Sequence, residues 1–127
     1  MINSQANNYQ EFVNMHELSL AQNIMDIVTE TAEKNNASKV VQIDLEIGAQ
    51  SGVVLEALRF AMDTLLENSI AEGAEVIYHE VEAIAQCNNC EHTWKAETLF
   101  ELCPKCEGFE TEIIQGKELQ IKSITAE

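Results

Sequence analysis

Cys87-Asn-Asn-Cys90 and, after twelve intervening residues, Cys103-Pro-Lys-Cys106 contain every cysteine of this chain. In each pair, the two-residue spacer allows a tight turn to aim two thiolates at one ion, and backbone N–H groups of the turn can donate to the sulfurs. Two such turns supply the four ligands of a tetrahedral zinc ion. The pattern predicts a four-cysteine zinc ribbon whose zinc is structural, because four thiolates leave no position open for a substrate.

Disulfide bonds and a redox-active Cys-x-x-Cys are the other uses of paired cysteines. Disulfides require an oxidising compartment, and the first residues have neither the basic nor the apolar segment of a secretory signal. A thioredoxin-like redox pair occurs singly at a strand-to-helix junction, whereas here both pairs lie in a short stretch without a helical pattern. We therefore expect a cytoplasmic protein that binds zinc.

The charge of the 127-residue chain is strongly negative, since 22 acidic and 7 basic residues give a formal net charge of −15. Nucleic-acid binding requires a basic surface that neutralises phosphates, so we expect no nucleic-acid partner. No apolar run approaches the roughly 20 residues of a membrane helix, so we expect no membrane association. The length suits one modest core with a metal-clipped insertion.

Helical periodicity appears in two stretches. Ser19, followed three residues later by Gln22, forms a capping-box pattern and predicts a helix over residues 19–35. A second amphipathic helix is expected over residues 53–68, with Ser51 as its cap.

Alternation with a period of two predicts strands over residues 41–47 and 74–86, and the second of these ends at the first cysteine. Asp44 and Glu46 lie on the other face of the first strand, where we interpret them as solvated. A last strand, residues 119–124, is expected to return beside these two. The expected fold class is α+β, with two helices packed on one face of a three-stranded sheet and the zinc ribbon inserted between strands.

Catalytic arrangements are absent from the sequence, which has three histidines, no glycine-rich phosphate loop and no Gly-x-Ser-x-Gly elbow, so we do not expect an enzyme. Met15-His16-Glu17 stands directly before the predicted helix. An imidazole beside a carboxylate and backbone nitrogens suits Ni(II) or Cu(II). A surface His-Glu pair without any ligand role is the more frequent case, so both interpretations stay open. We interpret His79 as a hydrogen-bonded or edge histidine and not as a ligand. His92 could compete for zinc, although four thiolates already complete the shell.

Several motifs follow one another in a fixed order along the chain. They are Met-His-Glu-Leu-Ser-Leu at 15–20, Leu45-Glu-Ile-Gly48 with Ser51-Gly52-Val53, Glu56-Ala-Leu58-Arg-Phe60, Ala71-Glu-Gly-Ala74, the two cysteine pairs, and Gly116-Lys-Glu118-Leu-Gln-Ile121-Lys-Ser123-Ile124. Together they resemble the HypA/HybF family of hydrogenase nickel-insertion proteins. The resemblance covers the chain from Met15 to its C-terminus.

The resemblance implies a metallochaperone that carries Ni(II) as transient cargo for nickel-iron hydrogenase maturation. It implies nickel binding at Met15, His16 and Glu17, with the His16 imidazole and backbone nitrogens as donors and Glu17 in an assisting role. Zn(II) at Cys87, Cys90, Cys103 and Cys106 would be structural. The implied partners are the GTPase HypB and the hydrogenase large subunit, and exposed strands leave a homodimer by strand exchange open.

Residues 1–14 depart from the family pattern, in which Met-His-Glu begins the chain and the free amine can be a donor. Translation could begin at Met15, the extension could be tolerated, or it could be removed. We expect a flexible extension at 1–14, a nickel-binding domain at 15–84 completed by 110–127, and a zinc ribbon at 85–109. The competing functions are a zinc-ribbon interaction or regulatory module without nickel transfer, and a thiol redox protein.

Overall fold

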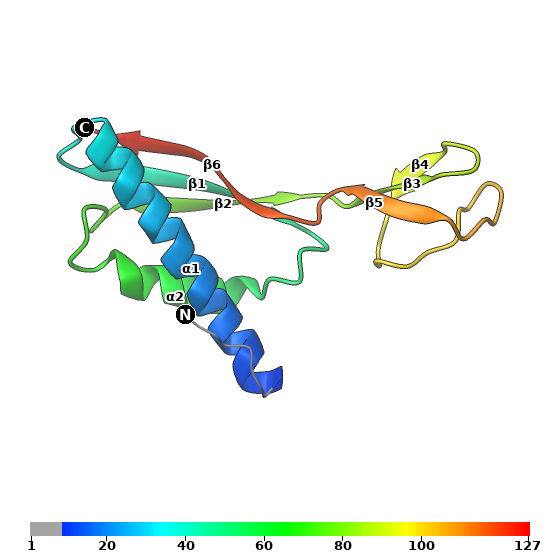
Figure 1. Ribbon diagram of the computed structural model, residues 1–127, viewed down its shortest axis with the longest axis horizontal. Helices are drawn as coiled ribbons and strands as arrows, with labels where there is room; N and C mark the ends of the chain where they lie inside the picture. Colours follow the sequence, from blue (N-terminus) through cyan, green and yellow to red (C-terminus); the bar gives the residue numbers. More distant parts are fainter. Residues whose placement is uncertain (1–8) are drawn as a thin grey trace. The chain divides into compact units, whose positions relative to one another are not determined.

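The computed structural model describes the backbone from residue 9 onward and the side chains from residue 16 onward. The order of elements is α1 (Tyr9–Lys34), β1 (Val40–Gly48), α2 (Leu55–Leu66), β2 (Glu75–Val81), β3 (Ile84–Cys87), β4 (Thr93–Lys95), β5 (Thr111–Gln115) and β6 (Leu119–Ala126). The strands form two three-stranded sheets, with the orders β2-β1-β6 and β4-β3-β5 (Figure 1). None of the described helices has the length and apolarity needed to cross a bilayer.

The chain forms two compact units. The helical unit contains the described part of Met1–Ile43 together with Val54–Val76 and Ser123–Glu127. The ribbon unit contains Asp44–Val53 and Ile77–Lys122. The helical unit therefore holds the Met-His-Glu segment, and the ribbon unit holds all four cysteines. The finer division predicted above, at residues 14, 84 and 110, stays a prediction.

The core of the helical unit lies where α1 packs on α2. Five buried residues of α1 recur at intervals of three and four, as expected for one face of a helix, namely Ala21, Ile24, Met25, Val28 and Ala32. The facing side of α2 buries Leu58, Ala61, Met62 and Leu66. The expected α+β class, with two helices and a three-stranded sheet, is confirmed.

The start of α1 differs from the prediction. The helix begins at Tyr9, and Ser19 lies exposed within it, so the predicted cap at Ser19 is wrong. The sequence between residues 9 and 34 contains neither glycine nor proline, so nothing in it stops the helix from continuing past the capping-box pattern. Residues 1–8 of the predicted flexible extension lie outside the described residues, whereas residues 9–14 belong to α1.

The start of α2 also differs from the prediction. The helix begins at Leu55, and its N-cap is Val54, whose side chain makes no capping hydrogen bond. The predicted cap, Ser51, instead accepts a hydrogen bond through Oγ from the Val53 N–H at 3.2 Å. Ser51 therefore closes a turn before the helix, and the first turn of α2 needs a partner from elsewhere in the chain.

The long strand predicted over residues 74–86 is two strands, β2 and β3, which belong to different sheets. The break falls at Glu82 and Ala83, where the backbone of Gly116 passes very close. A Cβ on Gly116 would lie 2.5 Å from the Glu82 carbonyl oxygen and 2.6 Å from the Ala83 Cα. Alternation cannot reveal this break, because the residues on either side of it keep the same period.

Candidate metal centres

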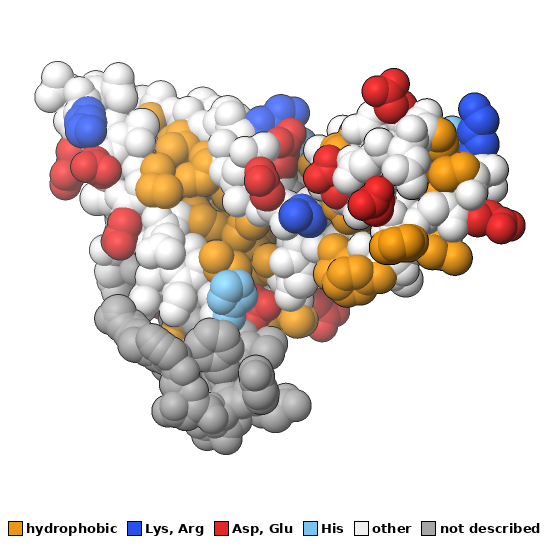
Figure 2. All heavy atoms as spheres, turned by 45° about the vertical axis from the view of Figure 1, so that its right-hand side comes forward, with side chains coloured by type: hydrophobic (Ala, Val, Ile, Leu, Met, Phe, Trp, Pro, Cys, Tyr) orange, Lys and Arg blue, Asp and Glu red, His pale blue; other side chains and the backbone are white. Residues whose placement is uncertain are grey.

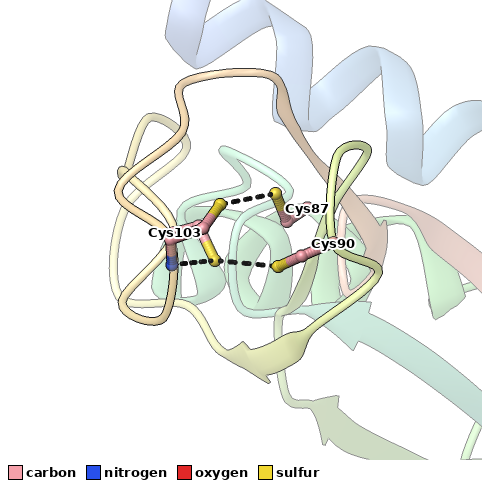
Figure 3. A group of neighbouring side chains, drawn as sticks. Cys87, Cys90 and Cys103 are labelled. Atoms are coloured by element: carbon pink, nitrogen blue, oxygen red, sulfur yellow. Dashed lines mark hydrogen bonds between the residues drawn. The ribbon is translucent and has the colours of Figure 1, made fainter.

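The four cysteine sulfurs form one cluster in the ribbon unit, all within 4.8 Å of one another. The Cys87 Sγ lies 3.6 Å from the Cys106 Sγ, and the Cys90 Sγ lies 3.7 Å from the Cys103 Sγ. Zinc bonded to sulfur at about 2.3 Å would place the corners of a tetrahedron roughly 3.8 Å apart. Figure 3 shows the labelled sulfurs pointing toward one another. Because the cysteines are free thiols at the separation that a four-sulfur shell requires, the cluster can hold a tetrahedral metal ion.

Backbone N–H groups donate to the first sulfur of each pair. The Asn89 N–H donates to the Cys87 Sγ at 3.4 Å, and the N–H groups of Lys105 and Cys106 donate to the Cys103 Sγ at 3.4 Å. Such donors stabilise a thiolate and do not occupy the side of the sulfur that faces a metal. The expected N–H to sulfur bonds of both turns are therefore present.

The residue that follows each pair closes its turn with a left-handed backbone. Glu91 has φ 66° and Glu107 has φ 62°. The Glu91 N–H donates to the Cys87 carbonyl at 2.9 Å, and the Glu107 N–H donates to the Cys103 carbonyl at 2.8 Å. The two turns thus have the same form, although glycine, the residue that adopts such a φ without strain, occupies neither position.

The pKa values of the thiols are unequal. Hydrogen bonding from the Cys90 backbone is the main cause that lowers the pKa of Cys87, although burial opposes it. Burial is the largest influence on Cys103 and raises its pKa, but hydrogen bonds, chiefly from the Cys106 backbone, bring that pKa down to about 7. The Gly108 backbone lowers the pKa of Cys106, yet the Cys87 thiol, burial and the other two thiols together raise it to about 12. Metal binding would therefore displace protons unequally from these three thiols.

A small core supports the cluster. Ala83, Ala85 and Ala96 are buried, and Trp94 and Ile113 pack against them. In β3 the residue Ala85 pairs with Trp94 of β4 and with Ile113 of β5. Because three alanines bury little apolar area, a bound ion would supply much of the stability of this sheet.

Glu101 fixes the loop between the two cysteine pairs. Its Oε1 accepts from the Trp94 indole N–H at 2.9 Å, and its Oε2 accepts from the N–H groups of Glu97 at 3.0 Å and Thr98 at 3.2 Å. These bonds, led by that of Trp94, lower the pKa of the Glu101 carboxyl. His92 stacks on the Trp94 ring with centroids 5.8 Å apart, so its ring packs within the ribbon and is not one of the four clustered ligands.

The Met-His-Glu segment lies within α1, in the helical unit. The side chain of Met15 lies outside the described residues, His16 is exposed, and Glu17 is fully buried, with 0% of its surface exposed. Consecutive helix residues point about 100° apart, so the structure does not bring the His16 and Glu17 side chains to one face. Both residues lie beyond the first turn of α1, where each backbone N–H donates to the carbonyl four residues earlier.

The Glu17 carboxylate makes a contact that the sequence did not reveal. Its Oε2 accepts a hydrogen bond from the Val54 N–H at 2.9 Å, at the N-terminus of α2. Its Oε1 has no hydrogen-bond partner among the described residues. Glu17, which is 37 residues away in sequence, therefore supplies the acceptor for the N–H of the N-cap residue of α2.

Asp44 is buried, with 8% of its surface exposed, so its interpretation as a solvated residue is wrong. Its Oδ1 lies 2.8 Å from the His79 Nε2. β1 is the central strand of its sheet, so a side chain on either face of it has neighbours from β2 and β6. The interpretation of His79 as a hydrogen-bonded histidine is confirmed. Glu46, expected to be solvated, is half-buried and accepts from the Gln120 side-chain amide at 3.0 Å.

Comparison with known proteins supplies the family. A family model described as "Hydrogenase/urease nickel incorporation, metallochaperone, hypA" matches residues 15–126. The chain belongs to the HypA family. The hydrogenase maturation factor HypA of Parabacteroides distasonis is 43% identical over 110 residues, which are 87% of this chain and 96% of that protein. The HypA of Chlorobaculum parvum is 39% identical over 113 residues, which are 89% of this chain and 100% of that protein.

Solved HypA structures have the same fold. The solution structure of the Ni metallochaperone HypA from Helicobacter pylori has a TM-score of 0.66 at 26% identity and covers 87% of this chain and 96% of its own. A second HypA solution structure has a TM-score of 0.70 at 27% identity, covering 89% and 97%. The resemblance of the motifs to the HypA/HybF family is confirmed, and the match to the family model begins at Met15.

Proposed function

We propose that this chain is a nickel metallochaperone, which binds Ni(II) and helps to insert it into the large subunit of nickel-iron hydrogenase. One observation carries the proposal: the match to the HypA family spans residues 15–126, from the Met-His-Glu motif through both cysteine pairs. The protein would act as a carrier and not as an enzyme.

Zn(II) is the proposed ion of the four-sulfur cluster, with Cys87, Cys90, Cys103 and Cys106 as ligands. The sulfur separations and the N–H donors to the sulfurs support this assignment. A closed shell of four thiolates retains its ion, so this metal would hold the ribbon together and would not be delivered. The ribbon at residues 85–109 and the nickel-binding domain at residues 15–84 with 110–127 would thus have separate roles.

Nickel is the proposed cargo of the Met15-His16-Glu17 segment, with the His16 imidazole as the principal donor. His16 is exposed, as a site that must receive and release an ion requires. Backbone nitrogens could join only if α1 began later than Tyr9 or opened locally, because within the helix their N–H groups are already hydrogen-bonded. We therefore propose that nickel loading involves the unwinding or the removal of the helix before Met15.

The proposed partners are the GTPase HypB and the hydrogenase large subunit, in the cytoplasm, and a homodimer stays open. Large apolar side chains on the ribbon unit support a protein partner. Phe100 is 90% exposed and Phe109 is 81% exposed, and Leu99 and Leu102 are exposed near them in sequence. Figure 2 shows hydrophobic side chains gathered over the ribbon at the right of the view, among acidic ones. Exposed apolar groups that gather in this way are typical of protein interaction sites.

Nickel titration with metal analysis tests the proposal. The comparison is between the full chain, a version that starts at Met15, and His16→Ala in each. We expect an exchangeable nickel that is lost on His16→Ala while the zinc content stays unchanged. His92→Ala is the matched control, because that imidazole packs on Trp94 and its loss should leave nickel binding intact.

The outcomes separate the alternatives. Equal nickel binding by both lengths would mean that imidazole and internal donors suffice, and binding by the shorter version alone would make the Met15 amine a donor. Nickel binding that survives His16→Ala, or that is absent from both lengths, would contradict the proposal. A protein that then contains zinc but binds no nickel would be an interaction module. A protein that contains no zinc and whose cysteines oxidise reversibly would be a redox protein.

A further inference from the structure

We propose that Glu17 is a positioning residue of the nickel segment, whose carboxylate anchors the His16 turn of α1 to the N-terminus of α2 and does not ligate nickel. The predicted effect of this anchor on nickel affinity rests on the proposed nickel function. The anchor itself is a contact within the helical unit, so its presence can be tested without metal.

The anchor replaces a missing local cap. In a capping box, a Glu at the third helical position reaches back to the N–H of the N-cap residue. The N-cap of α2 is Val54, and the third helical position is Ala57, which has no oxygen to offer. The Glu17 Oε2 occupies the acceptor position at 2.9 Å from the Val54 N–H. A residue of α1 therefore performs the role that a local glutamate would perform.

The burial of Glu17 makes the contact significant. An exposed surface of 0% removes the carboxyl group from water, and a buried polar group needs hydrogen-bond partners. The Val54 N–H and the positive end of the α2 dipole provide this compensation for Oε2. If the carboxylate turned outward toward an ion at His16, it would leave the Val54 N–H without this acceptor. The geometry therefore favours anchoring over nickel ligation.

The anchor has a consequence for nickel because His16 and Glu17 are consecutive. The inward direction of Glu17 fixes the outward direction of the His16 side chain on the helix. When the helix opens before Met15, the Glu17 to Val54 bond limits how far the unwinding proceeds. Loss of the anchor should therefore lower the nickel affinity, although no nickel ligand is removed.

The test compares Glu17→Gln, Glu17→Ala and His16→Ala in the full chain, each checked for zinc content and helical content. Glutamine keeps an acceptor oxygen for the Val54 N–H, and alanine removes it. We expect Glu17→Gln to retain the slow hydrogen exchange of the Val54 amide and a nickel affinity within about threefold of the native value. We expect Glu17→Ala to lose that protection and about tenfold in nickel affinity, as the loss of a hydrogen bond to a charged group predicts.

Val54→Pro provides a second variant that leaves Glu17 in place. Val54 has φ −85°, close to the value that proline requires, so the substitution removes the N–H donor with little backbone change. We expect a nickel affinity similar to that of Glu17→Ala. Nickel binding lost in Glu17→Gln but unchanged in Val54→Pro would make Glu17 a ligand and overturn the inference. An unprotected Val54 amide in the native protein would also overturn it, whereas nickel binding unaffected by His16→Ala would instead refute the proposed function.

Discussion

Glu91 and Glu107 show what single residues contribute to the ribbon. Each follows the second cysteine of its pair and has a positive φ. A left-handed backbone costs a non-glycine residue roughly 1–2 kcal/mol. Each N–H nevertheless closes its turn on the carbonyl of the first cysteine. The requirement of the turn therefore outweighs the local strain at both positions.

Glycine at position 107 should relieve this strain. We predict that Glu107→Gly raises the free energy of unfolding of the zinc-loaded protein by roughly 0.5–1 kcal/mol, because glycine adopts a positive φ freely but gains entropy in the unfolded chain. Denaturant unfolding measures the change. Glu110→Gly, at an exposed position without a positive φ, should instead destabilise the protein. Equal changes in the free energy of unfolding for the two variants would show that the positive φ at Glu107 is not strained.

Glu101 gives a prediction that depends on pH. Its lowered pKa, caused first by the Trp94 N–H, means that its ionised form stabilises the folded state. This contribution is present above the unfolded-state value of 4.5 and is lost as pH falls through the lower folded-state value. Glu101→Gln should therefore destabilise the protein more at pH 7 than at acid pH, as measured by unfolding at both. If the loss in the free energy of unfolding caused by Glu101→Gln became larger on acidification, the stabilising role of the ionised Glu101 carboxylate would be contradicted.

At the scale of elements, the close backbone crossing at the end of β1 determines where the strands break. A Cβ on Gly48 would collide with the carbonyl of Gly116, and a Cβ on Gly116 would collide with the backbone at Glu82 and Ala83. The Gln50 N–H donates to the Gly116 carbonyl at 2.8 Å. Three segments of the ribbon unit therefore meet here, and at two of them, Gly48 and Gly116, the space admits only glycine.

Gly116→Ala and Gly52→Ala separate steric crowding from backbone strain. Gly116 has φ 92° and Gly52 has φ 79°, but a Cβ at Gly52 meets nothing within 4 Å. We predict that Gly52→Ala destabilises by roughly 1 kcal/mol, the cost of the positive φ alone. Gly116→Ala should cost roughly 1–3 kcal/mol more, because the new methyl overpacks the crossing. Equal losses in thermal or denaturant unfolding would show that the crossing is not tight in solution.

Element boundaries were the part of the fold that the sequence predicted poorly. Ser19 and Ser51 both matched helix-start patterns, but α1 continues through Ser19 and α2 is capped by Glu17. A cap supplied across the fold by a distant residue leaves no local signal. Asp44 is a similar case. The alternating pattern predicted that its side chain faces solvent, but His79 on the neighbouring strand lies against it. Tertiary contacts determine the helix starts and the burial of Asp44, and such contacts cannot be predicted from the periodicity of the sequence.

At the scale of the whole molecule, the sequence predicted the fold class and the clustering of the cysteines well. Ligand spacing is a local property, and the thiols lie at the separation that it predicts. The nickel segment was found by resemblance, and its conformation was not predicted. Because α1 runs through Met15, the backbone nitrogens that the resemblance implies as donors lie inside a helix. At the proposed site, nickel loading would therefore depend on a change in structure that motifs alone cannot reveal.

We propose that one protein holds two metals for opposite purposes: zinc is retained by four thiolates, and nickel is released from His16. The most direct measurement loads the protein with both ions, mixes it with the nickel-free hydrogenase large subunit, and counts each metal on both proteins after separation. We predict that nickel passes to the large subunit, that zinc remains on the four cysteines, and that His16→Ala transfers no nickel. Nickel that stays bound to this protein, zinc that leaves with the nickel, or equal nickel transfer by His16→Ala would contradict these roles for the two metals.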